Sequence, residues 1–308
     1  MSLLGWSLLL GLSALWGASF WFIEVGLASV PPMTLVLIRV VSGGLALLLF
    51  LLASRRGLPL DGQFWGRAAI MGLLNNVLPF CLIAWGQLFI SAGMAAILNA
   101  HTAFAAVWIA ALFIASETLR LHRIAGVVIG IFGVVLVIGP ENITAMGQMA
   151  GTDQQLWGQM AVLAATFSYA LAGVWGKLKL AGRDVLQTAC ATLLCASLWL
   201  APVVLWRDGL PPAQLLFDAG FMSAMLTLGL AGTALAYWLY FRLLELTGAS
   251  NLALVTIIVP VFAVALDALL LGVLPGLPVL AGFGVVAIGM AVLDGRLPAR
   301  LIKGRAAR

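Results

Sequence analysis

The sequence predicts an all-α polytopic membrane protein in which ten transmembrane helices form two inverted five-helix repeats around a central cavity. Three observations lead to this prediction. Of the 308 residues, 63% are hydrophobic and only 9% are charged, whereas about a quarter of the residues of a soluble domain are charged. Apolar runs of helix length follow one another along the chain. Basic residues gather in alternate gaps between these runs.

The apolar runs are long enough to cross a bilayer. A hydrocarbon core of roughly 30 Å needs about 20 helical residues. The ten expected spans are residues 3–27, 33–53, 66–90, 93–115, 123–140, 157–179, 185–206, 220–241, 249–272 and 278–294. The first run lacks the basic start of a cleaved signal peptide, so we expect it to remain as a helix of the mature protein.

The distribution of positive charge sets the expected orientation. All but two of the 16 Lys and Arg residues lie in alternate connections or in the C-terminal tail, the exceptions being Arg39 and Arg207. Because positively charged connections stay on the cytoplasmic side, both termini are expected to be cytoplasmic. This pattern accounts for the net charge of +5. A nucleic-acid partner is not expected, since no basic patch is interleaved with polar or aromatic residues.

The three cysteines give no sign of a disulfide or a metal site. Cys81, Cys190 and Cys195 lie within apolar runs and have no His or Asp beside them, which is typical of small buried side chains. We therefore expect no metal and no cofactor.

An intramembrane enzyme, such as a lipid or prenyl transferase, is the alternative from another functional class. Metal-assisted chemistry of that kind needs paired acids or histidine clusters. The candidates Glu24, His101 and Asp267 are scattered over separate spans, and no Asp-x-x-Asp or His-Glu-x-x-His motif occurs. The sequence therefore favours a protein that is not an enzyme.

Internal repeats divide the chain into two halves. The polar connection of residues 141–156 separates five spans from five. Residues 75–104 align without gaps with residues 233–262, and residues 124–137 match residues 280–293 with glycines at the same places. An odd number of spans per repeat puts the halves in opposite orientations, as in many transporters that bind substrate near the midplane between repeats.

Several segments resemble the EamA-type drug/metabolite transporters. They are ALWGASF in the first span, Ile38-Arg39 in the second, SAGMAAILNAHTAFAA and its twin GASNLALVTIIVPVFAV, and SETL-x4-AGVVIGIFGVVLV. Within that superfamily the chain is most similar to ten-helix bacterial exporters of aromatic amino acids and related metabolites. Where the family often has a Glu-Pro pair, this sequence has His101-Thr102 and Val259-Pro260.

The resemblance implies a domain plan and a location. The expected parts are a first five-helix EamA-like repeat at 1–140, a periplasmic linker at 141–156, a second, inverted EamA-like repeat at 157–295 and a basic cytoplasmic tail at 296–308. The protein is expected to be a multi-pass component of the bacterial inner (cytoplasmic) membrane.

Polar and aromatic side chains near mid-depth are the candidates for substrate binding. Each helical residue advances about 1.5 Å, so the midplane lies roughly ten residues from a span end. The candidates are Trp16, Ser19, Asn75, Asn76, Phe80, Asn99, His101, Ser168, Tyr169, Thr233, Tyr237, Trp238 and Thr256. They lie on spans one, three, four, six, eight and nine, so six helices are expected to ring the cavity. Any single one of them could instead only join neighbouring helices.

Two of these candidates exclude each other on a continuous helix. Asn99 and His101 are two residues apart, or about 200° around a helix, so only one of them can face the cavity. Which one does so stays open. For His101, lining the cavity is favoured over an obligatory role in proton coupling.

Several prolines, charged residues and glycines are expected to shape the helices and their packing. Pro79 and Pro260 remove backbone hydrogen bonds and are expected to act as hinges for gating, with static bends as the alternative. Glu24 and Arg39 can approach across one hairpin and are expected to form a structural ion pair. Glycines let helices approach closely, so spans five and ten are expected to pack through Gly126, Gly130, Gly133, Gly282, Gly284 and Gly289. A dimer face is the lesser alternative, and we expect a monomer with a homodimer possible.

The expected function is export of small amphipathic metabolites, most of all amino acids, including aromatic ones. The expected partners are a small-molecule substrate and the lipid bilayer. Transport would proceed by alternating access, with facilitated diffusion favoured because the midplane carries amides and hydroxyls without a fixed charge. The alternative is a proton-coupled antiporter of drugs or aromatic cations.

Overall fold

The computed structural model describes residues 2–114, 121–138, 154–252, 254–272 and 274–293, and all regular elements in these ranges are helices. Nine of the described helices are long and apolar enough to cross a membrane, and a tenth apolar helix is slightly shorter. The all-α polytopic fold is confirmed. The expected tail at 296–308 and nearly all of the expected linker at 141–156 lie outside the described residues.

The first half of the chain supplies five spans. They are α1 (Leu3–Leu27), α2 (Pro32–Ala53), the run of α3 (Gly62–Gly72), η1 (Leu73–Val77) and α4 (Leu78–Gly86), the pair α5 (Ala92–Asn99) and α6 (Thr102–Phe113), and α7 (Leu121–Ile138). Side-chain oxygens cap three of the helix starts. The Asp61 carboxylate accepts a hydrogen bond from the Gln63 N–H at 2.9 Å, so the third span begins four residues before its expected start.

The second half repeats this order. Its spans are α9 (Gln154–Lys179), α10 (Val185–Arg207), the run of α11 (Ala219–Leu226), η3 (Thr227–Leu235) and α12 (Ala236–Thr247), the run of α13 (Ala249–Leu252), α14 (Leu254–Leu266) and η4 (Asp267–Leu271), and α15 (Leu277–Leu293). A short 3-10 turn, η2 (Ala213–Phe217), precedes α11. The eighth span runs six residues beyond its expected end, to Thr247, and Gly248, with a φ of 78°, stops the helix.

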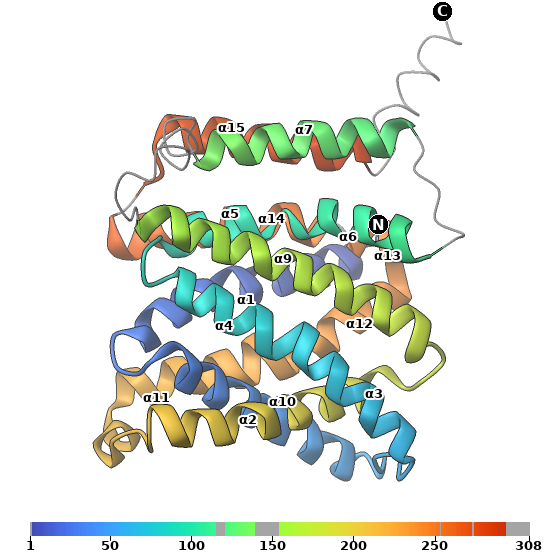
Figure 1. Ribbon diagram of the computed structural model, residues 1–308, viewed down its shortest axis with the longest axis vertical. Helices are drawn as coiled ribbons and strands as arrows, with labels where there is room; N and C mark the ends of the chain where they lie inside the picture. The colour runs from blue at the N-terminus through green and yellow to red at the C-terminus, as the bar shows by residue number, and fades with distance from the viewer. Residues whose placement is uncertain (1, 115–120, 139–153, 253, 273, 294–308) are drawn as a thin grey trace, which may run out of the picture.

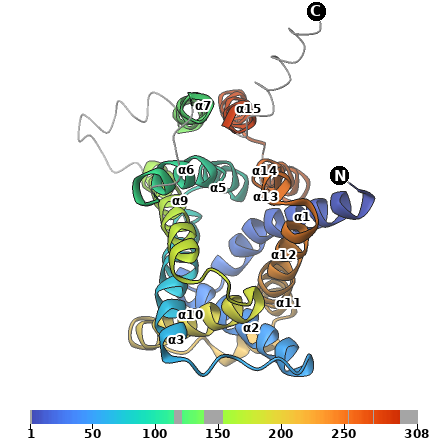
Figure 2. The same cartoon turned by 90° about the vertical axis from the view of Figure 1, so that its right-hand side faces the viewer.

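The helices pair in a pattern that repeats after five spans. α1 packs against α14 and α12, and α9 packs correspondingly against α6 and α4. In the same way, α2 packs against η3 and α10 against α3. Figure 2 shows these helices arranged as a frame, with α6 and α9 facing α14 and α12, and α2 and α10 closing one end. This pairing is consistent with the inverted repeat that the sequence predicts.

α7 and α15 form a pair beyond the frame, as Figures 1 and 2 both show. Glycines bring the two helices together: a Cβ atom on Gly133 would lie 2.9 Å from the Gly282 carbonyl oxygen, and one on Gly126 would lie 2.7 Å from that of Gly289. The predicted packing of spans five and ten is confirmed for these four residues. Gly284 differs, because a Cβ atom there would meet nothing within 4 Å.

Candidate functional site

Spans three and eight leave the α-helical register at equivalent positions. η1 and η3 are both π-helical. The last five residues of η3 lie 158 residues after those of η1, which is the offset that aligns the two repeats in sequence. π-helical turns occur frequently at functional sites. Both repeats therefore place an irregular turn near the middle of a membrane span.

A hydrogen bond from span six holds the first of these turns. In η1 the Leu78 N–H bonds to the Leu73 carbonyl five residues back. The next residue, Pro79, has no N–H to donate to the Leu74 carbonyl. The Ser168 hydroxyl of α9 donates to that carbonyl oxygen instead, at 2.7 Å. The hydroxyl of this predicted site residue is thus engaged with the backbone of span three.

The Tyr237 hydroxyl is the meeting point of the two halves. It accepts hydrogen bonds from the Nδ2 atoms of Asn75, at 3.0 Å, and of Asn76, at 3.4 Å. Asn76 is 0% exposed, and its Oδ1 atom has no hydrogen-bond partner among the described residues. A polar contact between η1 and α12 therefore joins spans three and eight.

The Arg39 guanidinium lies beside this contact. Its Nε atom donates to the Thr233 Oγ1 at 3.0 Å, and its Cζ atom lies 3.9 Å from the centre of the Phe80 ring. Tyr237 lies one helical turn after Thr233, and Tyr169 follows Ser168 on α9. We use "central cluster" for the residues Arg39, Asn75, Asn76, Phe80, Tyr169, Thr233 and Tyr237.

A glycine contact lets Arg39 reach the centre. A Cβ atom on Gly43, one helical turn after Arg39, would lie 2.9 Å from the Thr233 Cγ2 and 3.1 Å from the Gly229 carbonyl oxygen. α2 and η3 can therefore approach closely. The Thr233 hydroxyl itself donates to the Leu228 carbonyl at 2.9 Å, so its oxygen is fixed where the Arg39 Nε meets it.

The predicted ion pair between Glu24 and Arg39 is wrong. Arg39 points along α2 to Thr233, because Gly43 brings η3 within reach of its long side chain. The Glu24 Oε2 atom is buried and has no hydrogen-bond partner among the described residues. Asp267 is 1% exposed, and its Oδ2 accepts a hydrogen bond from the Gly93 N–H at 2.7 Å. The Asp267 carboxylate thus binds the backbone at the start of α5.

Of three further predicted site residues of spans one and eight, Trp16 and Ser19 pack against the cluster's helices and Trp238 does not. The Trp16 ring lies 5.7 Å from that of Tyr240, measured between centroids. The Ser19 hydroxyl donates to the Leu15 carbonyl at 2.8 Å within α1 and packs against Gly232. Trp238 is 41% exposed, because successive residues of α12 turn away from the Tyr237 side.

The fourth span is broken where the sequence suggested a continuous helix. α5 ends at Asn99, α6 begins at Thr102, and the Thr102 hydroxyl donates to the Asn99 carbonyl at 2.7 Å. On a continuous helix Asn99 and His101 could not both face the cavity. The break between α5 and α6 removes that restriction. The His101 ring lies 5.5 Å from that of Phe104 and 6.2 Å from that of Phe167. Asn99 Oδ1 and His101 Nδ1 are both buried without a described hydrogen-bond partner.

The proline of the second repeat lies in a different helical environment from that of the first. Pro260 lies inside α14, which continues to Leu266 without a break, whereas Pro79 lies at the start of α4, after a π-helical turn. The Thr256 hydroxyl of α14 contacts the Met290 sulfur of α15 at 3.4 Å. The gating roles of both prolines stay predictions.

Two glutamines were missed by the sequence analysis. The Gln87 Nε2 donates to the Phe20 carbonyl of α1 at 2.8 Å. Gln159 is fully buried in α9, and neither of its amide atoms has a described partner. Both are amides in apolar runs, which is the signal that identified Asn75, but they lie nearer the span ends than the midplane rule allowed.

Buried polar atoms without partners fall on the spans that were predicted to ring the centre. Such atoms are rare in proteins unless water or a ligand serves them. Among the described residues they belong to Trp21, Glu24, Asn76, Gln87, Asn99, His101, Gln159 and Asp267. These residues lie on or directly after spans one, three, four, six and nine. None of the eight lies on span two, five, seven or ten.

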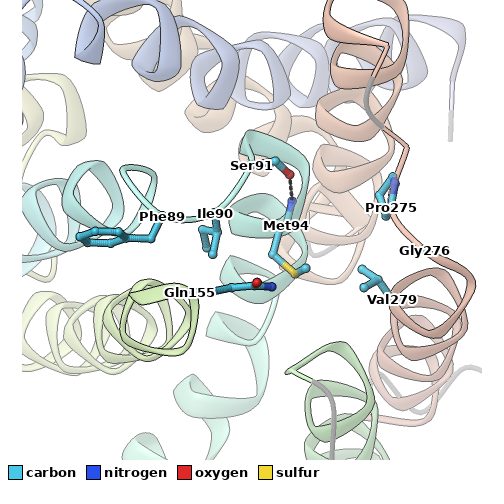
Figure 3. Close-up of a pocket in the computed structure, with 8 residues that line it drawn as sticks. All are labelled: Phe89, Ile90, Ser91, Met94, Gln155, Pro275, Gly276 and Val279. Carbon is cyan, nitrogen blue, oxygen red and sulfur yellow. Dashed lines mark hydrogen bonds between the residues drawn. The ribbon is translucent and has the colours of Figure 1, made fainter. Parts of the chain in front are cut away.

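A cavity of about 270 Å³ lies apart from the central cluster. Figure 3 shows its lining, which comes from the α4–α5 turn, α5, the start of α9 and the segment that leads into α15. The lining residues are Phe89, Ile90, Ser91, Met94, Gln155, Pro275, Gly276 and Val279. Most are apolar, and none is a predicted site residue.

Comparisons with known proteins match both halves of the chain to transporters. The profile of the EamA-like transporter family matches the chain twice, over residues 3–139 and 156–293. An uncharacterized transporter of Bacillus subtilis is 25% identical over 256 residues, 83% of this chain and 84% of the relative. A probable amino-acid metabolite efflux pump of Salmonella typhimurium is 26% identical over 284 residues, 90% of each chain.

Two further comparisons concern a second efflux pump and a solved structure. A probable amino-acid metabolite efflux pump of Escherichia coli is 25% identical over 265 residues, 83% of each chain. A crystal structure with 19% identity has a TM-score of 0.66 and covers 96% of this chain and 97% of its own, which shows a shared fold. Because the family profile covers almost all of both halves, this multi-pass membrane protein belongs to the EamA-like transporter family.

Proposed function

We propose that this protein exports small amphipathic metabolites across the bacterial inner membrane, with amino acids, including aromatic ones, as the leading substrate class. The observation that carries the proposal is the central cluster at mid-depth, built by both halves of the chain. Membership of a transporter family supports it. So do two bacterial relatives that are named probable amino-acid metabolite efflux pumps.

The chemistry of the cluster suits an amphipathic solute. Amide, hydroxyl and guanidinium groups can bind polar substituents through hydrogen bonds. The aromatic faces of Phe80 and of the Trp16–Tyr240 pair can bind an apolar or flat side chain. A site of few convergent polar groups among aromatic ones is typical of small-molecule binding.

Alternating access is the proposed mechanism. In transporters with inverted repeats, one set of helices rocks against the other around a site near the midplane. Here the π-helical turns η1 and η3 lie at that level in both halves. Their weaker helical hydrogen bonding makes them suitable hinge points, and Pro79 adds to this in the first half. The described cluster has no acidic residue, so facilitated diffusion remains the favoured mode.

One experiment tests transport directly. Purified protein is reconstituted into vesicles preloaded with unlabelled solute, and counterflow of a panel of labelled amino acids and aromatic cations is measured. We expect saturable counterflow of amino acids above that of protein-free vesicles. The absence of saturable counterflow for the whole panel would contradict the proposal.

Proton-coupled antiport is a second candidate because of one specific observation: among the described residues, one carboxylate oxygen each of Glu24 and Asp267 is buried without a hydrogen-bond partner. Burial disfavours the charged form of a carboxyl group, so such a group can carry a proton. The test compares counterflow with and without an imposed pH gradient, in the wild type and in Asp267→Asn. A strict need for the gradient, lost in the variant, would favour antiport over facilitated diffusion.

A further inference from the structure

Arg39 is a buried positive charge without a carboxylate partner. Its exposed fraction is 7%. The ion pairs among the described residues are Arg56–Asp184, Arg183–Asp61, Arg207–Asp208 and Arg242–Glu245. A charge held inside a membrane protein is costly unless it is paired, and such residues commonly mark substrate pathways.

The described residues contact the Arg39 guanidinium at its Nε–H and at one face. The Nε–H is used by Thr233 Oγ1, and one face of the group lies over the Phe80 ring. A guanidinium has five N–H donors, four of them on the two terminal nitrogens. Neither terminal nitrogen has a hydrogen-bond acceptor among the described residues. Neither is among the buried unpartnered polar atoms of the interior. The two terminal nitrogens, which together match the two oxygens of a carboxylate, are thus available to a ligand.

An unpartnered acceptor lies one helical turn from the residues that hold Arg39, because Asn76 comes four residues before Phe80 in span three. Asn76 donates to that hydroxyl through Nδ2, while its Oδ1 is buried and has no described partner. Tyr237 itself follows Thr233, the partner of Arg39, by one helical turn. The cluster therefore offers a cationic donor pair on Arg39 and a neutral acceptor on Asn76. A zwitterion that carries a carboxylate and an ammonium group complements both.

We propose that Arg39 determines substrate specificity by binding the carboxylate of a transported α-amino acid through its terminal nitrogens, with Asn76 Oδ1 accepting a hydrogen bond from the ammonium group. The inference rests on the proposed transport function and names the substrate group that the central cluster recognises. It also replaces the neutral midplane expected from the sequence with a positively charged one, which disfavours organic cations.

Three matched solutes test this inference in reconstituted vesicles. L-Phenylalanine carries both charged groups, L-phenylalaninamide lacks the carboxylate, and N-acetyl-L-phenylalanine keeps the carboxylate but lacks the ammonium group. For the wild type we expect the transport efficiency (kcat/KM) of phenylalanine to exceed that of its amide by about tenfold or more, the factor typical of a charge-assisted hydrogen bond.

Substitution of Arg39 should remove this preference selectively. In Arg39→Gln we expect the kcat/KM of both carboxylate-bearing solutes to fall by about tenfold or more, while that of phenylalaninamide changes by less than about threefold. Arg39→Lys should lie between, because lysine keeps the charge but loses the planar fork. Thr233→Val, which removes the oxygen that orients Nε, should weaken the preference without abolishing it.

The possible results separate the two proposals. Equal transport of phenylalanine and its amide by the wild type would overturn the role of Arg39 and leave the transport function intact. An equal loss of all three solutes in Arg39→Gln would also overturn it, because Arg39 would then serve only the structure. If the wild type transports no solute of this set or of the wider panel, the transport function itself fails. Should Arg39→Gln not fold, the wild-type comparison and Arg39→Lys still decide.

Discussion

At the residue scale, one hydroxyl group of the second half accepts two side-chain hydrogen bonds from the first half. Tyr237 from the second half receives the amide N–H groups of Asn75 and Asn76 from the first half. Asn76 is completely buried, so removal of its partner would leave a polar group unpaired in the interior. The Tyr237 hydroxyl should therefore contribute both to the stability of the fold and to the positions of Asn75 and Asn76 in the cluster.

Tyr237→Phe should therefore lower both stability and transport. The loss of hydrogen bonds to a buried group costs about 1–3 kcal/mol, so the midpoint of thermal unfolding in detergent should fall, and the KM for transported amino acids should rise. Tyr240→Phe is the matched control, because Tyr240 contacts Trp16 and Phe241 through its ring. Equal behaviour of the two variants would show that the Tyr237 hydroxyl has no special role.

Six of the seven residues of the central cluster are among the site residues that the sequence predicts, and the seventh, Arg39, was assigned to an ion pair. Asn75, Asn76 and Thr233 were predicted because depth along a span follows directly from residue number. Arg39 was assigned to an ion pair, because the destination of a long side chain depends on which helix packs beside it. That neighbour is set by Gly43 in contact with Thr233, which sequence order does not reveal.

At the element scale, the bend of span three is a matter of backbone hydrogen bonding. Pro79 leaves the Leu74 carbonyl without a helical donor, and the Ser168 hydroxyl of α9 supplies one. The sequence predicted that the proline would free a carbonyl. It did not predict the π-helical turn, in which the carbonyl left without a donor is that of Leu74. Nor did it predict the break between α5 and α6. Both features arise where tertiary contacts replace the regular helical hydrogen bonds.

A double-mutant cycle tests this account of span three. Ser168→Ala should cost about 1 kcal/mol, the usual value of a hydrogen bond in a membrane interior. In a Pro79→Ala background the cost should largely vanish, because the restored N–H can serve a backbone carbonyl within the helix. The free energy of unfolding in detergent of the four proteins gives the coupling energy. Additive effects would mean that the two residues act independently.

Glycines fix the contact between α7 and α15. A Cβ atom on Gly282 would lie 2.8 Å from the Val137 backbone nitrogen and 2.9 Å from the Gly133 carbonyl oxygen, whereas one on Gly284 would meet nothing within 4 Å. Gly282→Leu should therefore separate the helices and lower the thermal unfolding midpoint clearly, since overpacking typically costs about 1–3 kcal/mol. Gly284→Leu, on the same helix, should be close to neutral. A reversed order would contradict the described packing.

At the scale of the whole molecule, the chain builds its frame from pairs of helices that recur after five spans. The sequence predicted this plan well, because the length of apolar runs and the alternation of basic connections are set by the bilayer itself. The topology also carries a testable orientation. Connections on the Arg56 and Arg183 side should be cytoplasmic, and the opposite connections should be outside.

Two engineered cysteines measure that orientation. Leu60 lies in the α2–α3 connection and Leu210 in the segment after α10, and both are well exposed. In intact cells a membrane-impermeant maleimide should label Leu210→Cys, while Leu60→Cys should react only after the membrane is opened. The native Cys190 and Cys195 are buried and Cys81 is partly buried, so the background variant lacking all three serves as the control. Labelling of Leu60→Cys in intact cells would invert the proposed topology.

The central claim is that the polar cluster between the two halves binds the transported solute. Its most direct test is equilibrium exchange of labelled L-phenylalanine in reconstituted vesicles without any ion gradient, compared between the wild type, Asn76→Ala and Ser197→Ala. Ser197 is the control, because its hydroxyl bonds within its own helix, to the Leu193 carbonyl of α10. We predict saturable exchange in the wild type and in Ser197→Ala, and a rate lower by about tenfold in Asn76→Ala. Unchanged exchange in a folded Asn76→Ala protein would contradict the account.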